Sequence, residues 1–228
     1  MFAPKSSSSF FELSAEEQER RLSIDRYGDF QLTDAVRPAS GIVPSEGYRH
    51  EILRRKPTGP EIPLLRIAAS REKLMDLFRD LLDPLGEELM VVLQTSHESL
   101  LDGTSKPREI YRLLPVDRAI FDSTLLDHED LLLDDGCTGI AAVDSQVTSE
   151  VEWDEHKTLI VYGRALQPFK EILARHRIAC RNDMRFIVDD LHVHCSDEGA
   201  EDRFTQLQYA LNMETEGEAD EDPFAGAY

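Results

Sequence analysis

The clearest hydrophobic pattern in the chain is a helical stripe between residues 70 and 86. Apolar residues recur there every three or four positions, so they share one face of an amphipathic helix. Ser70 stands where an N-cap is favoured, and Pro84 and Gly86 end the pattern. The apolar positions are Leu74, Leu77, Phe78, Leu81, Leu82 and Leu85. The spacing therefore predicts a helix that packs against a core through this stripe.

Three further segments show helical spacing, and each predicts a helix with one apolar face. The first runs from Pro115 to Leu133 and stops before Gly136, which is placed for a left-handed cap. The second ends near His176, and the third begins at about Asp197 with acidic residues in its first turn. The inward-facing positions are Phe121, Leu125, His128 and Leu132, then Leu166, Phe169, Leu173 and His176, then Phe204, Leu207 and Leu211.

Short apolar or alternating runs predict the strands of a sheet. Acidic residues alternate with Val151 and Trp153, and the run 158–162 is apolar, so the two segments predict a hairpin joined through residues 154–157. The other predicted strands are 64–69, 89–94, 139–143 and 185–196.

This order of elements predicts an α+β fold, because it includes a hairpin and does not alternate strictly between strand and helix. We expect a mixed, largely antiparallel sheet with helices on one face; the alternative is a doubly wound α/β sheet. Residues 1–61 predict an irregular, partly disordered N-terminal arm, since 27–63 is rich in Gly and Pro. Residues 62–212 form the predicted globular domain. Residues 213–228 predict a disordered acidic tail, which has little apolar content to bury.

The chain is strongly acidic, with a formal net charge of −20. Residues 116–160 hold 12 acidic and 2 basic residues, and residues 187–222 hold 12 and 1. A polyanion is repelled by nucleic acid phosphates and by anionic membrane surfaces, which argues against both as ligands. Basic proteins and cations are the better ligands. The charge therefore favours an acidic interaction protein that binds a basic protein partner.

The cysteines and the apolar segments predict where the protein resides. Cys137, Cys180 and Cys195 make an odd number without paired spacing, which is not typical of a disulfide framework and indicates a reducing compartment. The N-terminus lacks the apolar stretch of a signal peptide, and no segment approaches the roughly 18 apolar residues of a membrane span. We expect a cytoplasmic protein that does not bind membranes.

The strongest candidate for chemistry is the segment 185–196, R-F-I-V-D-D-L-H-V-H-C-S. On a strand, Asp190, His192 and His194 share one face, whereas Asp189 points to the other. Zinc, iron and manganese accept this mixture of oxygen and nitrogen ligands. His156 is a further ligand if tertiary packing brings it near. The first function we expect is the acidic interaction protein, with no catalytic activity identified. The alternative is a small metal-dependent hydrolase or metal-binding domain that uses this row, with a metal-bound water as the nucleophile.

Other interpretations of the same residues stay open. The row is also compatible with a solvated or hydrogen-bonded strand end, and either imidazole is suited to proton transfer. No phosphate-binding loop, G-x-S-x-G motif or C-x-x-C pair occurs, and Leu132 excludes an H-E-x-x-H zinc helix at His128. A third possibility is a structural subunit whose arm, residues 27–63, wraps a neighbouring chain.

Overall fold

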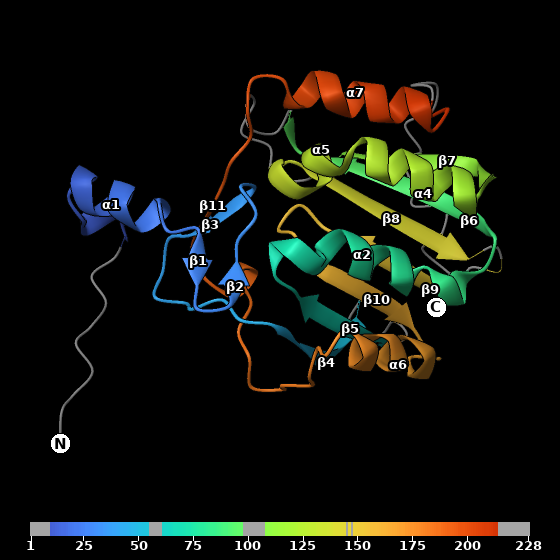
Figure 1. The fold of residues 1–228 in the computed structure, drawn as a ribbon, viewed down its shortest axis with the longest axis horizontal. Coiled ribbons are helices and arrows are strands. Elements are labelled where there is room, and N and C mark those ends of the chain that lie inside the picture. Colours follow the sequence, from blue (N-terminus) through green and yellow to red (C-terminus); the bar gives the residue numbers. More distant parts are fainter. Residues whose placement is uncertain (1–9, 55–60, 98–107, 145, 147, 214–228) are drawn as a thin grey trace.

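A seven-stranded antiparallel sheet organises the chain (Figure 1). The computed structural model describes residues 10–54, 61–97, 108–144, 146 and 148–213. Each neighbouring pair of strands in this sheet is antiparallel. In spatial order the strands are β4 Gly47–Arg54, β5 Glu61–Ala68, β10 Leu159–Gly163, β9 Ser149–Trp153, β8 Thr138–Asp144, β6 Glu88–Thr95 and β7 Arg108–Asp117. The predicted α+β class is confirmed, and the doubly wound alternative is wrong because it requires parallel strands.

The helices lie on one side of this sheet. Figure 1 shows α2, α4, α5 and α6 in front of the strands, with α7 packed along α5. Their bounds are α2 Arg71–Leu81, α4 Arg118–Asp127, α5 Glu129–Asp134, α6 Gln167–Arg175 and α7 Ala200–Ala210; short 3-10 turns occur at η1 Phe10–Glu12, η2 Asp83–Leu85 and η3 Ile187–Asp189. Within the described residues, no helix combines the length and the apolar content needed to cross a bilayer.

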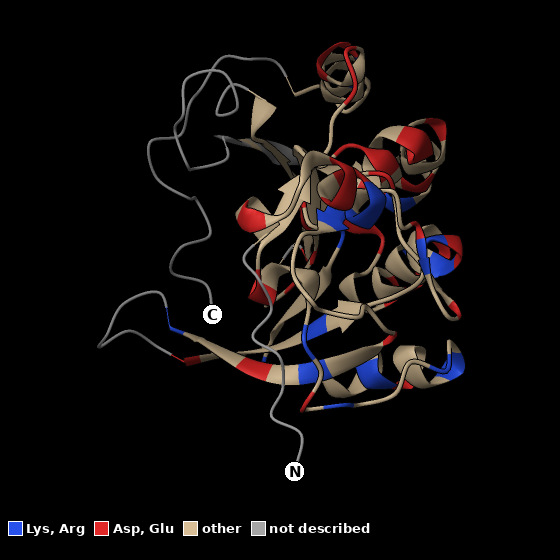
Figure 2. Ribbon diagram, turned by 90° about the vertical axis from the view of Figure 1, so that its left-hand side faces the viewer, with Lys and Arg blue, Asp and Glu red and all other residues tan. Residues whose placement is uncertain are grey.

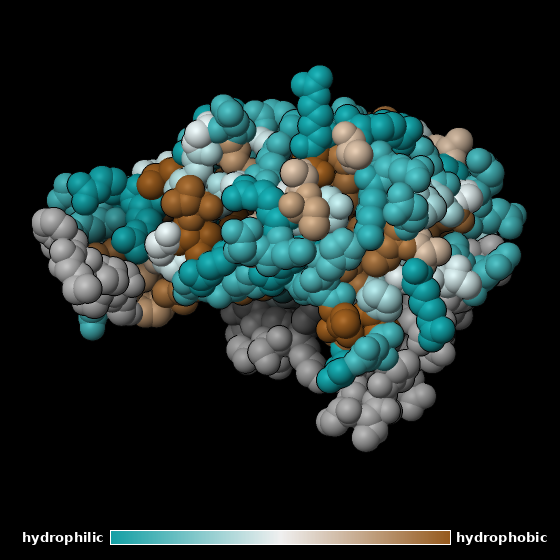
Figure 3. Space-filling view, turned by 90° about the horizontal axis from the view of Figure 1, so that it is seen from below, coloured by the Kyte–Doolittle hydropathy of each residue, from teal (hydrophilic) through white to brown (hydrophobic). Residues whose placement is uncertain are grey.

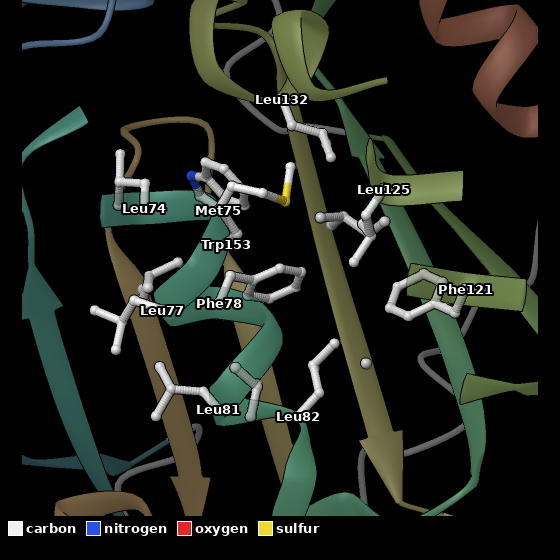
Figure 4. Close-up of a cluster of buried hydrophobic side chains, with 14 of the residues drawn as sticks. Leu74, Met75, Leu77, Phe78, Leu81, Leu82, Phe121, Leu125, Leu132 and Trp153 are labelled. Carbon is white, nitrogen blue, oxygen red and sulfur yellow. The ribbon is translucent and has the colours of Figure 1, made fainter. Parts of the chain in front are cut away.

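The main core lies between the sheet and α2. The predicted apolar stripe of α2 is buried, and Phe78 packs against Trp153 of β9 with ring centroids 5.3 Å apart (Figure 4). Val151 and Trp153 point to this core, whereas Glu150 and Glu152 alternate to the other face of β9. The hairpin of β9 and β10 therefore follows the predicted pattern, with Trp153 anchoring the end from which the turn begins.

The predicted helix from Pro115 to Leu133 differs from the structure. Residues 108–117 form strand β7, which the sequence pattern did not predict, and Asp117 caps α4 by accepting a hydrogen bond from the Ala119 N–H at 2.9 Å. The helix is also interrupted at His128, whose φ of −120° lies outside the helical range and separates α4 from α5. The predicted inward positions Phe121, Leu125 and Leu132 are nevertheless buried.

The N-terminal region is integrated into the fold rather than being an irregular arm. Strand β4 pairs with β5 from Gly47 to Arg54, so the predicted boundary at residue 61 falls inside an antiparallel pair. The preceding elements are α1 Ala15–Leu22, with a capping box between Ser14 and Glu17, and three short strands, β1 Arg26–Tyr27, β2 Phe30–Gln31 and β3 Val36–Pro38. Residues 1–9 of the arm and 214–228 of the acidic tail lie outside the described residues.

The surface is largely hydrophilic. Figure 3, seen from the side of α6 and β4, shows scattered hydrophobic patches on a mostly polar face. Acidic positions gather on α4, α5 and α7, whereas basic positions occur on α6 at the opposite end of the molecule (Figure 2). The three cysteines are free thiols.

The packing of Phe78 predicts a large loss of stability on truncation. Phe78→Ala removes a fully buried ring from its contact with Trp153 and should lower the free energy of unfolding by about 3–5 kcal/mol in urea denaturation. The control is Phe11→Ala, because Phe11 is 75% exposed and its loss should change stability by less than about 0.5 kcal/mol. Equal effects of the two substitutions would contradict this account of the core.

Candidate functional site

Three histidines from two distant segments meet at one end of the sheet, beside the β9–β10 turn. His156 lies in the β9–β10 turn, and His192 and His194 lie in strand β11 His192–His194. The ring centroids are 4.9 Å apart for His156 and His192, 4.7 Å for His156 and His194, and 5.1 Å for His192 and His194. One ring nitrogen of each lies within 4.8 Å of one from each of the others. We call these three residues the histidine cluster.

Strand β11 sets the direction of two of the imidazoles. It pairs with β3, with His192 opposite Pro38 and His194 opposite Val36, so the two histidines share a face as their spacing predicts. The Ala39 N–H donates to the Leu191 carbonyl at 2.9 Å and extends this pairing. The two-stranded ribbon formed with the N-terminal region therefore holds both rings against His156.

The predicted strand 185–196 is much shorter in the structure, and this changes the place of Asp190. The turn η3 at Ile187–Asp189 interrupts the chain before the strand begins. The carboxylate of Asp190 accepts hydrogen bonds from Arg185 at 3.1 Å and from the Leu191 N–H at 2.8 Å. Among the described residues, the cluster brings together His192 and His194 with His156 and does not include Asp190.

Each histidine has an acceptor beside its Nδ1 atom. The Nδ1 of His192 lies 2.7 Å from the carbonyl oxygen of Asp190, and that of His194 lies 2.5 Å from the carbonyl oxygen of Gly136. The Nδ1 of His156 lies 3.5 Å from the Asp154 carboxylate. A carbonyl oxygen only accepts, so Nδ1 carries the proton and the neutral ring presents its lone pair on Nε2. Metal-ligating histidines have this kind of outer partner.

A close backbone approach at Gly136 positions His194. The Gly136 N–H donates to the Cys195 carbonyl at 2.7 Å, and the Cys195 N–H donates to the Ala35 carbonyl at 2.7 Å. A Cβ atom at position 136 would collide with the carbonyl oxygens of Ala35 and Cys195. Glycine is therefore required by this approach and not, as predicted, by a left-handed cap, because its φ is not positive.

The turn that carries His156 is tightly held. The Asp154 carboxylate accepts a hydrogen bond from the Thr158 N–H at 2.8 Å, and the Lys157 N–H donates to the Asp154 carbonyl at 3.0 Å. Lys157 is buried, and its Nζ donates to the Thr138 carbonyl at 2.7 Å. Burial lowers the pKa of Lys157 to about 8. His156 is thus fixed by the ionisable residues on both sides of it.

The surroundings shift the imidazole pKa values in opposite directions. Burial disfavours the charged form of His156, but the hydrogen bond and negative charge of Asp154 outweigh it and raise the pKa of His156. Burial lowers the pKa of His194, and the neighbouring rings of His156 and His192 lower it further. The metal-free cluster therefore has one ring that protonates readily and one that resists protonation.

Comparison with protein-family models, curated proteins and solved structures found no match to this chain. The interpretation of the cluster therefore depends on its own geometry.

The Asp154 contact predicts a pKa change that NMR can measure. In the metal-free protein, His156 should protonate above the ordinary histidine pKa of 6.5 and His194 below it. Asp154→Asn should lower the pKa of His156, because Asn keeps the acceptor for the Thr158 N–H but carries no charge. The imidazole resonance of His50 is the control, since no Asp154 contribution acts on it. An unchanged His156 titration in the Asn variant would refute this account.

Proposed function

We propose that the protein binds a transition metal ion, zinc in the first place, through His156, His192 and His194. The supporting observation is that three ring nitrogens converge within 4.8 Å while an acceptor faces the Nδ1 of each ring. Imidazole suits zinc, copper, iron and nickel, whereas magnesium and calcium prefer oxygen ligands. The proposed ligand set differs from the predicted one in one residue, because it contains His156 in place of Asp190.

The spacing of the rings is compatible with zinc after a small contraction. In a tetrahedral site with Zn–N bonds of about 2.0–2.1 Å, neighbouring nitrogens are about 3.4 Å apart. The present separations of at most 4.8 Å would shorten by no more than about 1.4 Å. Rotation of the three partly buried imidazole side chains would supply this contraction while the β9–β10 turn keeps its hydrogen bonds.

A set of three neutral imidazole ligands is also typical of a catalytic zinc site rather than a structural one. Catalytic zinc sites have three protein ligands and a water in the fourth position, and the metal lowers the pKa of that water to about 7. Glu155 acts electrostatically on both His156 and His194, and its carboxylate accepts a hydrogen bond from Ser96 at 2.7 Å. We infer a hydrolase in which a zinc ion held by the three imidazoles would lower the pKa of a bound water, and Glu155, whose charge acts on His156 and His194, would serve as the proton acceptor.

Metal titration tests the ligand set. Metal-stripped protein titrated calorimetrically with zinc should bind one equivalent more than the His192→Ala/His194→Ala double variant. His156→Ala should lose the same equivalent, whereas His50→Ala, a histidine in β4 outside the cluster, should bind as the parent protein does. Equal stoichiometry in the parent and the double variant would show that these imidazoles are not ligands.

The hydrolase part of the proposal has its own test. Zinc-loaded protein should hydrolyse an activated ester such as 4-nitrophenyl acetate, with a rate that rises with pH through about 7 as the bound water ionises. Glu155→Gln should retain the metal equivalent and lower the rate. A zinc-loaded protein with no activity above that of the double variant would reduce the proposal to metal binding alone.

A second candidate function is binding of a basic protein partner by an acidic, cytoplasmic protein. The observation that favours it is the group of acidic positions on α4, α5 and α7 (Figure 2). Its residues include Asp127, Asp130, Glu201 and Asp202, which are exposed and form no ion pair with another described residue. A surface of one charge sign attracts basic partners and does so less at high salt.

Salt-dependent binding to polylysine tests this surface. The protein should bind polylysine at low ionic strength, and a variant with Asp127→Asn, Asp130→Asn, Glu201→Gln and Asp202→Asn should bind more weakly. The control is Asp25→Asn/Asp29→Asn, which removes exposed acidic charge in the β1–β2 region. Binding that does not change with salt, or that falls equally in the control, would argue against the surface on α4, α5 and α7.

A further inference from the structure

A second group of metal-ligating side chains lies at the same end of the sheet. His97 follows β6, and Asp135 and Cys137 precede β8; one ligand atom of each lies within 4.8 Å of the others. Strands β6 and β8 pair with Thr95 opposite Thr138, and the Ser96 N–H donates to the Cys137 carbonyl at 2.9 Å. The end of one strand and the start of the next thus bring an imidazole, a carboxylate and a thiol together.

The group is buried, unlike the histidine cluster. Asp135 and Cys137 are each 1% exposed and His97 is 9% exposed. The Asp135 carboxylate accepts hydrogen bonds from the Thr138 hydroxyl and, at 3.3 Å, from the Cys137 N–H. An ionised carboxylate has about four acceptor positions, so positions remain on Asp135 for a metal ion.

Within the described residues, the Nε2 atom of His97 lacks a well-formed hydrogen bond. It lies 3.1 Å from the Asp135 carboxylate, but it is buried and has no hydrogen-bond partner of acceptable geometry among the described residues. The other ring nitrogen, Nδ1, lies 2.8 Å from the Thr95 hydroxyl, which orients the ring. The Nε2 atom, the carboxylate and the thiol are therefore close enough together to bind one metal ion, with Thr95 as the outer partner of the imidazole.

We propose that His97, Asp135 and Cys137 form a second, structural zinc site, independent of the histidine cluster. Nitrogen, oxygen and sulfur donors together suit zinc. On binding, a Zn–S bond forms as the Cys137 thiol loses its proton to solvent, so no oxidant or reductant is involved. The thiolate and the carboxylate then neutralise the two positive charges of the ion. A neutral site can be buried at little electrostatic cost, which a site of three neutral imidazoles cannot.

The Ser196 hydroxyl lies beside this group as a hydrogen-bond partner of two of the proposed ligands. The hydroxyl of Ser196 contacts both the Asp135 carboxylate and the Cys137 thiol. Ser196 follows Cys195, whose backbone pairs with Gly136, so the ribbon of β3 and β11 closes this site as well. The two sites share the segment 135–137, because the Gly136 carbonyl orients His194, but they share no ligand.

Cobalt substitution distinguishes the two sites, because thiolate bonded to Co²⁺ gives an intense charge-transfer band in the near ultraviolet and imidazole does not. Metal-stripped full-length protein titrated with Co²⁺ should develop this band with one equivalent. Cys137→Ala should abolish it, and His97→Gln should weaken Co²⁺ binding at the same site. Cys180→Ala is the control for an exposed thiol, and circular dichroism checks that each variant folds.

The outcomes separate this site from the proposed function. A band that persists in the His192→Ala/His194→Ala variant would support an independent thiolate site, even if the histidine cluster binds nothing. A band that is absent from the parent protein, or that survives Cys137→Ala and is lost in Cys195→Ala, would overturn the assignment. Should Cys137→Ala fail to fold, a band lost in folded His97→Gln supports the site, and a band unchanged in His97→Gln overturns it.

Discussion

The close approach of three backbone segments at Gly136 is the contact on which both sites depend. The N-terminal β3, the C-terminal β11 and the start of β8 meet there through hydrogen bonds of 2.7 Å, in space that a side chain would fill. The segments at Ala35, Gly136 and Cys195, which lie 59 to 160 residues apart in the sequence, are thereby joined at one end of the sheet. His194 gains the acceptor for its Nδ1 atom, and Ser196 reaches Asp135 and Cys137. A larger residue at position 136 would therefore disturb both groups of ligands.

The antiparallel sheet explains why the histidine cluster and the group of His97, Asp135 and Cys137 lie at the same end of the sheet. In antiparallel neighbours the end of one strand lies beside the start of the next. The end of β6, the start of β8 and the β9–β10 turn consequently share one edge, as the pairing of Thr95 with Thr138 and of Ile140 with Trp153 shows. Trp153 packs against Phe78 in the core and secures the strand from which the turn of His156 projects. The helices thus stabilise the sheet from one side, and the short β3–β11 ribbon lies at the ends of its strands.

The sequence predicts those elements whose buried face follows from the spacing of their own apolar residues. The stripe of α2 and the alternation in β9 are of this kind, and so is the spacing that places His192 and His194 on one face. What the sequence did not predict depends on distant partners. Strand β4 follows a Gly- and Pro-rich segment and gains its structure by pairing with β5. The grouping of Asp190 with the histidines requires a longer strand, and η3 interrupts that strand before Asp190. The sequence names His156 as a further ligand only if tertiary packing brings it near, and the structure brings it there from a turn 36 residues before His192.

The net charge of the protein attracts cations in general, whereas the type of ligand atom determines which metal ion a site prefers. A charge of −20 raises the concentration of every cation near the surface, so it does not select among metals. Selection comes from the ligand atoms, because carboxylates on the helices suit hard cations and imidazole and thiolate suit zinc. The two proposed sites would differ in their effect on the charge of a bound ion. The partly buried imidazoles would leave that charge available to polarise a water, whereas the buried thiolate and carboxylate would neutralise it.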